Sequence, residues 1–133
     1  MAEIINVRTI ANEKGTFGLL DREDSLPFKP KRILFFSDIS GDRGGHSHKK
    51  MKQILIAVKG SCRIYTNNGK EKHNLILDSP QKALFLKPED WHSMHDFSKD
   101  AVMLAIGSEY FDEEDYIYEE PKNDWIRKSS KIE

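Results

Sequence analysis

The sequence has a single cysteine, no long hydrophobic run and almost no net charge. Because Cys62 is the only thiol among 133 residues, no disulfide can form within the chain, and we expect a reducing compartment, the cytoplasm. No stretch approaches the ~18 apolar residues of a membrane-spanning helix, and the first residues lack a signal-peptide pattern. With 21 basic and 22 acidic residues, the chain lacks the basic excess of a nucleic-acid-binding surface. This balance still permits a small anionic ligand, which needs only one or two local cations.

Short apolar runs that end at turn residues recur along the chain. They are rich in Ile, Val, Phe and Tyr, and they cover residues 32–36, 53–58, 62–66, 75–77, 83–86 and 101–106. Such runs predict β-strands, and their spacing predicts an all-β sandwich or barrel rather than alternating strands and helices. We expect one domain over residues 1–133, in which about 122–133 form a polar C-terminal tail.

Two local patterns refine this prediction. Asn68-Gly69 is a pair that tolerates the positive φ of a hairpin turn, so we expect residues 62–66 to pair with 73–77. The segment 111–117 predicts one or two helical turns capped by Asp112, and the acidic run 112–115 is interpreted as the solvated start of that helix. We interpret Cys62 as a buried residue that behaves as a small apolar side chain. His73 and His95 are interpreted as surface residues.

The pattern His46-Ser47-His48 carries the clearest chemical signal. Side chains two positions apart on a strand project from the same face, so these two imidazoles should lie together, with Gln53 continuing the same neighbourhood. Gly44 and Gly45 precede the pair and allow a sharp turn or a close approach.

Three interpretations of this pair are open: a metal site, proton transfer or polar contact with a ligand, and a purely structural role. Gln53 stands where a metal site would need an acid, which weakens the first interpretation. Nearby cations, Arg43 among them, favour a neutral imidazole that can act as a base. Arg43 itself suits a phosphate or a developing oxyanion. Trp91 and His92 are candidates for an aromatic wall and a donor at a cavity mouth, although Trp91 could equally be core.

The residues also carry a family resemblance. Gly, His-x-His, Gln53 and Gly60 approximate the first cupin motif, and Pro88 to His92 approximate the second. The segment 43–50 resembles the Arg-Gly-x-His-Ala-His-Lys signature of the sugar 3,4-ketoisomerases, and further matches follow in order from about residue 15 to 117. The matched pieces are Leu26-Pro27-Phe28, Lys31-Arg32, Gly60-Ser61, Asp78-Ser79-Pro80, Trp91, Asp96-Phe97-Ser98 and Asp112 to Ile117.

The resemblance implies a cupin jelly roll, a homodimer with exchanged strands and no metal or other cofactor. It also implies a thymidine-diphosphate 4-keto-6-deoxy sugar as the ligand, in the synthesis of an unusual sugar for a surface glycan. His48 would move a proton between sugar carbons, and His46 would assist. The substrate-binding residues expected on this basis and from the patterns above are Arg43, Gln53, Trp91, His92 and Lys14.

This sequence departs from the family where tyrosines usually follow Lys-Arg, because the strand reads Ile33-Leu34-Phe35-Phe36-Ser37. Lys14 stands in the place of the usual arginine, and His92 replaces an arginine after Trp91. Other interpretations are a sugar-nucleotide epimerase, a cupin that binds a sugar nucleotide without catalysis, and a metal-dependent cupin.

Overall fold

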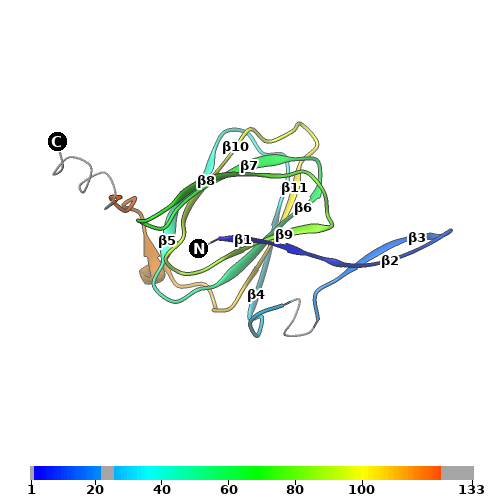
Figure 1. The fold of residues 1–133 in the computed structure, drawn as a ribbon, viewed down its shortest axis with the longest axis horizontal. Coiled ribbons are helices and arrows are strands. Elements are labelled where there is room, and N and C mark those ends of the chain that lie inside the picture. Colours follow the sequence, from blue (N-terminus) through cyan, green and yellow to red (C-terminus); the bar gives the residue numbers. More distant parts are fainter. Residues whose placement is uncertain (1, 22–25, 124–133) are drawn as a thin grey trace.

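Two antiparallel β-sheets face each other, as drawn in Figure 1. The computed structural model describes residues 2–21 and 26–123, and all element counts below refer to those ranges. The first sheet has the strand order β1 (Glu3–Asn6), β9 (Lys82–Leu86), β6 (Gln53–Lys59), β11 (Val102–Gly107) and β4 (Arg32–Phe36). The second has the order β12 (Tyr116–Ile117), β5 (Arg43–His48), β10 (Trp91–His95), β7 (Cys62–Asn67) and β8 (Lys72–Leu77). The all-β prediction is therefore confirmed.

Each apolar run predicted as a strand lies in one, except that β11 begins at Val102 rather than at Ala101. The predicted hairpin is also present, since Cys62 pairs with Leu77 and Thr66 with His73. Sequence patterns did not predict the first three strands, nor β10 and β12. β2 (Arg8–Asn12) and β3 (Gly15–Leu19) form a separate hairpin in which every residue except Leu19 is exposed. Without a buried face, these strands show no alternation of apolar and polar residues that a sequence pattern could detect.

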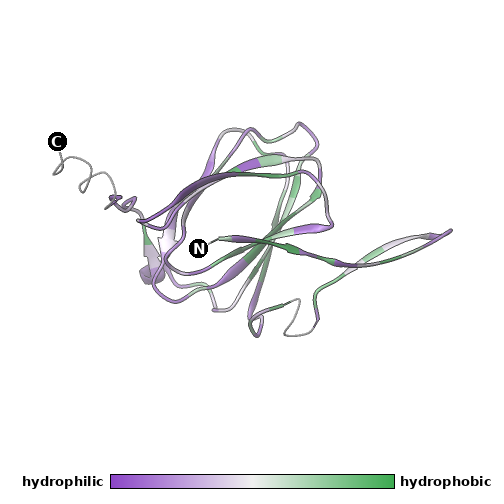
Figure 2. Cartoon of the chain, viewed as in Figure 1, coloured by the Kyte–Doolittle hydropathy of each residue, from purple (hydrophilic) through white to green (hydrophobic). Residues whose placement is uncertain are grey.

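Apolar side chains from both sheets fill the space between them. The first sheet contributes residues such as Leu55, Leu84 and Met103, and the second contributes Ile64 and Leu77, each at most 1 % exposed. A second cluster around Ile54 and Phe85 contains the partly buried Leu26 and Phe28. Figure 2 shows hydrophobic residues along the central strands and hydrophilic ones in the loops. Because both faces of β6 are buried, its sequence is a continuous aliphatic run.

The predicted helix at 111–117 is much shorter in the structure. Asp112 does cap it, since its side chain accepts a hydrogen bond from the Glu114 N–H. The helix is only the 3₁₀ turn Glu113–Asp115, because Tyr116 and Ile117 pair with β5 instead of continuing it. The rest of the expected tail lies outside the described residues, except that Asn123 is buried and exchanges two amide hydrogen bonds with Asn67. No helix in ranges 2–21 and 26–123 is long and apolar enough to cross a membrane.

Candidate active site

Strand β5 brings His46 and His48 to the same face, as the His-x-His spacing predicts. Their ring centroids are 4.9 Å apart. The strand lies against β10, and its register shifts between His92 and Ser93. Gly44 makes this approach possible, because its φ is +84° and a Cβ there would stand 3.1 Å from the His92 carbonyl oxygen. Gly44 therefore serves a close strand contact.

Asp115 fixes the orientation of the His48 ring. The His48 Nδ1–H donates to Asp115 Oδ2 at 3.0 Å, and the backbone N–H groups of Lys50 and Met51 also donate to this carboxylate. Asp115 is buried, so the interpretation of residues 112–115 as a wholly solvated run is wrong at its last position. With Nδ1 donating its proton, the neutral ring presents a lone pair at Nε2. His48 Nε2 is buried and has no hydrogen-bond partner among the described residues.

The histidines of the cluster are neutral at pH 7. Burial, followed by the charge of His92 and of Arg32, lowers the pKa of His46 from 6.5 to about 4. Burial, followed by the charge of His46, lowers the pKa of His48 to about 4 against the opposing effect of Asp115. The neutral imidazoles agree with the prediction, but the main cause is burial rather than the loop cations. The glycines and cations that flank the pair also predict exposed imidazoles, and this prediction is wrong, since His48 is only 4 % exposed.

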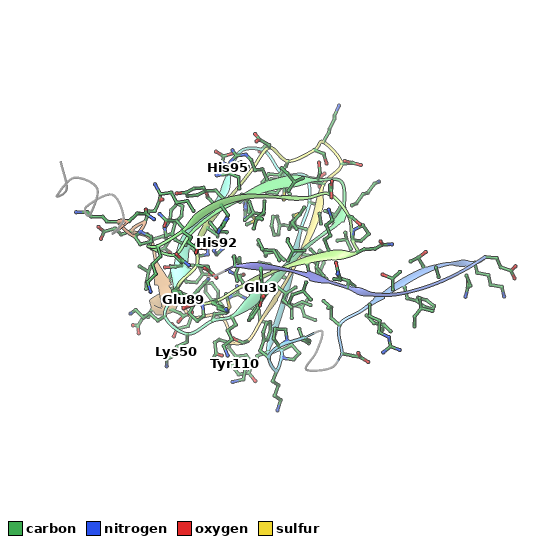
Figure 3. The ribbon with its side chains drawn as sticks, viewed as in Figure 1. Glu3, Lys50, Glu89, His92, His95 and Tyr110 are labelled. Carbon is green, nitrogen blue, oxygen red and sulfur yellow. The ribbon has the colours of Figure 1, made fainter. Side chains whose placement is uncertain are left out.

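His92 is the third imidazole of the cluster, although it lies 44 residues beyond His48 in the sequence. It is 2 % exposed, and its ring centroid is 4.9 Å from that of His46. Figure 3 places it toward the interior of the barrel, whereas His95 lies at the periphery. Its Nδ1 contacts the Asp90 carbonyl oxygen at 3.1 Å, and its Nε2 lies 3.3 Å from Gln53 Nε2. Burial lowers the pKa of His92 to about 4.

A pocket of about 250 Å³ opens beside these rings. Its polar lining comprises Arg32, Arg43, His46, Gln53, His92 and Tyr116. Leu34 and Phe36 line it where the family tyrosines would stand, and the Arg43 guanidinium lies 5.4 Å from the Phe36 ring centroid. Three predicted residues, Arg43, Gln53 and His92, therefore meet His46 at one pocket.

Sequence patterns missed Tyr116 and Arg32 as site residues. The Tyr116 ring lies 4.6 Å from the rings of both His46 and His48, and it supplies a phenol hydroxyl to a pocket that lacks the usual tyrosines of β4. Arg32 adds a second guanidinium beside Arg43. The ordered match over residues 112–117 was the signal that could have identified both Asp115 and Tyr116.

His48 lies between this pocket and a larger one of about 1070 Å³. It lines the larger pocket together with Ser47, Lys49, Lys52 and Lys87. The His48 ring nevertheless packs against the rings of His46, His92 and Tyr116, all of which line the smaller pocket. The base candidate therefore lines the larger pocket and packs directly behind residues that line the smaller one.

Two other predicted site residues lie apart from the cluster. Trp91 does not line the smaller pocket; its indole N–H donates to the Tyr118 carbonyl oxygen, and its ring faces Tyr65. Lys14 lies in the exposed turn between β2 and β3, at the far end of the projecting hairpin in Figure 1. Both assignments stay predictions.

Three imidazoles and Gln53 are the groups that could face a metal ion. Gln53 turns an amide N–H rather than a carboxylate toward His92, and an N–H is not a metal ligand. Within residues 2–21 and 26–123, no group of three or more His, Cys, Asp or Glu side chains has the arrangement of a metal site.

Comparison with known proteins identifies the family. Residues 1–128 match the family model described as "FdtA: WxcM-like, C-terminal". The TDP-4-oxo-6-deoxy-α-D-glucose-3,4-oxoisomerase of Aneurinibacillus thermoaerophilus is 39% identical over 117 residues, which are 86% of this chain and 84% of that protein. The chain belongs to the FdtA family of sugar 3,4-ketoisomerases.

Solved structures of FdtA-family relatives share the fold. A 3,4-ketoisomerase from Helicobacter canadensis superposes with a TM-score of 0.84 at 32% identity, covering 89% of this chain and 90% of that one. A mutant of the 3,4-ketoisomerase from Thermoanaerobacterium thermosaccharolyticum, solved with TDP-4-keto-6-deoxyglucose, gives a TM-score of 0.83 at 32% identity over 89% and 87% of the two chains. The fold of this FdtA-family isomerase is therefore the cupin barrel.

Proposed function

We propose that this isomerase converts a thymidine-diphosphate 4-keto-6-deoxy sugar into its 3-keto isomer, in the synthesis of an unusual sugar for a surface glycan. The single observation that carries the proposal is the state of His48. Its Nδ1–H is held by Asp115, and its buried Nε2 has no partner among the described residues. A neutral imidazole with a free lone pair beside a pocket suits a general base. The relatives' names supply the substrate class.

The proposed chemistry moves one proton between neighbouring carbons. A 4-keto group acidifies the hydrogen on C3, and His48 Nε2 removes it as a proton while the electron pair forms an enediolate. His48 then returns that proton to C4, and the oxygen on C3 becomes the carbonyl. One base serves both carbons because they are adjacent.

A second transfer completes the reaction, because the C3 hydroxyl loses its proton and the C4 oxygen gains one. His46 is the candidate for this transfer, since it lines the smaller pocket and its ring is 4.9 Å from that of His48. Arg43 and Arg32 line the same pocket, where either guanidinium can stabilise the enediolate or bind the diphosphate.

The test is incubation with TDP-4-keto-6-deoxyglucose in deuterated water, followed by mass spectrometry and NMR of the sugar. We expect a 3-keto product that carries deuterium at C4, because His48 exchanges its proton with solvent during part of the turnovers. His48→Asn should abolish both the product and the exchange at C3. His46→Asn is the matched control, and it should keep exchange at C3 while it slows isomerisation.

Two results would contradict this proposal. Deuterium at C5, or an inverted configuration at C3, with retention of the 4-keto group and no 3-keto product would indicate an epimerase. Stabilisation of the protein by the sugar nucleotide without any exchange would indicate a cupin that binds but does not catalyse.

We further propose that two copies of the chain exchange their β2–β3 hairpins. A two-stranded hairpin is marginally stable alone, and this one leaves the aromatic ring of Phe17 63 % exposed. β4 lies at the edge of its sheet and presents Ile33 and Phe35, 68 % and 72 % exposed. A second copy that covers these surfaces would bring Lys14, at the hairpin turn, toward the pocket of its partner.

A further inference from the structure

The contacts of His92 separate its role from those of His46 and His48. A carbonyl oxygen can only accept a hydrogen bond, so the His92 nitrogen beside the Asp90 carbonyl, Nδ1, must carry the ring's proton. The opposite nitrogen, Nε2, then has a lone pair, and the Gln53 amide at 3.3 Å is its donor. Both ring nitrogens are therefore engaged, whereas His48 Nε2 has no partner among the described residues. A histidine with no vacant nitrogen cannot carry a proton for the substrate unless these bonds break.

The same contacts fix the orientation of Gln53. An amide whose nitrogen must face His92 turns its oxygen the other way. Gln53 lines the smaller pocket. Its Nε2 makes the contact with His92, and its Oε1 makes no hydrogen bond within the described residues. In this orientation the Gln53 oxygen, and not its N–H, is left to accept a hydrogen bond from a ligand.

An acceptor is scarce in this pocket. Arg32 and Arg43 carry only donors, and the side chains besides Gln53 and His92 that can accept here are the His46 ring and the Tyr116 hydroxyl. A hexose ring presents hydroxyl groups, each of which must donate its hydrogen to an acceptor when it is taken out of water. Gln53 Oε1 is placed to receive such a hydrogen.

We propose that His92 is a positioning residue, which orients the Gln53 amide so that Gln53 Oε1 accepts a hydrogen bond from a hydroxyl of the sugar. This inference rests on the proposed sugar-nucleotide substrate. Gln53 thereby contributes to specificity for the sugar, and His92 affects sugar binding only by orienting the Gln53 amide.

The test is a double-mutant cycle on binding. Dissociation constants of TDP and of TDP-4-keto-6-deoxyglucose are measured for the wild type, Gln53→Met, His92→Phe and the double variant. The dissociation constant of TDP divided by that of TDP-4-keto-6-deoxyglucose isolates the contribution of the sugar to binding. Gln53→Met should reduce this ratio about 10-fold, which corresponds to one well-formed hydrogen bond. His92→Phe, which keeps a buried ring of similar size, should reduce it less.

Coupling within the cycle decides the proposal. If His92 acts through Gln53, His92→Phe has no further effect in the Gln53→Met background. Additive losses would overturn the proposal, because they would mean that His92 contacts the sugar itself. Since the cycle measures binding, it gives an answer even if the deuterium experiment finds no isomerisation.

A second measurement requires no variant and so does not depend on whether His92→Phe folds. ¹⁵N NMR of the wild-type imidazoles should identify His92 as the Nδ1–H tautomer, unchanged from pH 8 to pH 5.5. An Nε2–H tautomer, or titration within this range, would overturn the proposal, because His92 could then no longer accept the Gln53 N–H.

Discussion

The His48–Asp115 contact sets which nitrogen of His48 can act as a base. Asp115→Asn keeps the shape of the side chain but replaces an acceptor-only carboxylate by an amide that can also donate. An amide N–H beside Nδ1 would stabilise the Nε2–H tautomer, which has no lone pair to offer the substrate. We expect turnover to fall by about 10²-fold or more while TDP affinity stays near the wild-type value.

Kinetics and calorimetry with TDP check this expectation. Asp112→Asn is the matched control, because Asp112 belongs to the same acidic segment but its side chain accepts a hydrogen bond from the Glu114 N–H and not from His48. Equal turnover in Asp115→Asn and the wild type would refute the role given to Asp115.

The pH dependence of activity follows from the same cluster. A base must be unprotonated to act, so activity disappears as the pH falls through the pKa of His48, which burial lowers to about 4. An ordinary histidine, with a pKa of 6.5, would already be about 90% protonated at pH 5.5. We expect kcat/KM at pH 5.5 to stay close to its value at pH 7.5. A decline centred near 6.5, with folding verified by circular dichroism, would contradict this expectation.

The sequence predicted part of this site, and the limits are physical. His46 and His48 are two residues apart, so strand geometry alone places them together. Asp115 lies 67 residues from His48 in the chain, and no local pattern indicates that the two meet. A run of acidic residues predicts a solvated segment when no distant hydrogen-bond donor can be foreseen. Here the donors to Asp115 are a buried imidazole and two backbone N–H groups.

At the scale of elements, the turn between β6 and β7 depends on one residue without a side chain. Gly60 has a φ of +73°, and a Cβ there would collide with Ser98 Oγ and lie 2.7 Å from Asp100 Oδ1 and 2.9 Å from Ala101 Cα. Gly60→Ala therefore combines backbone strain with a steric clash. We expect it to lower the free energy of unfolding by about 3 kcal/mol or more, measured by urea denaturation.

Gly41 offers a matched control for this change. Its φ is +85°, but nothing lies within 4 Å of an added Cβ. Gly41→Ala should therefore show only the left-handed backbone cost, about 1–2 kcal/mol. If the two variants lose equal stability, the packing around the β6–β7 turn does not contribute.

Strands that carry an apolar run were predicted, including the largely exposed β4, and strands without such a run, such as the buried β10, were not. β6 and β9 carry aliphatic runs because both faces are buried, and the β7–β8 hairpin has an Asn-Gly turn. The exposed β2 and β3 have neither signal. The length of the helix at 111–117 was overestimated. Acidic residues and a cap residue indicate where a helix begins, but they do not indicate that Tyr116 and Ile117 pair with β5.

At the scale of the whole molecule, the proposed exchange of hairpins means that residues from two chains form each active site. Mixing His48→Asn chains with Lys14→Ala chains tests this. In a mixed dimer, one pocket would carry both substitutions and the other would carry neither, so activity should return in part. Unfolding and refolding the mixture before the assay allows the chains to exchange.

The outcome is compared with each variant treated alone. If the mixture shows only the sum of the separate activities, Lys14 does not act across an interface. Light scattering supplies the assembly state, and Ile33→Ser with Phe35→Ser should convert a dimer to monomers.

The single thiol has a practical consequence for studying this barrel. Cys62 is 2 % exposed, its Sγ contacts the Met103 sulfur, and burial raises its pKa to about 11. A thiol reagent can therefore modify it only when β7 separates from the core. The rate of modification therefore reports the opening of the barrel, and its slowing by a bound nucleotide would give the affinity of the native state for that nucleotide without any mutation.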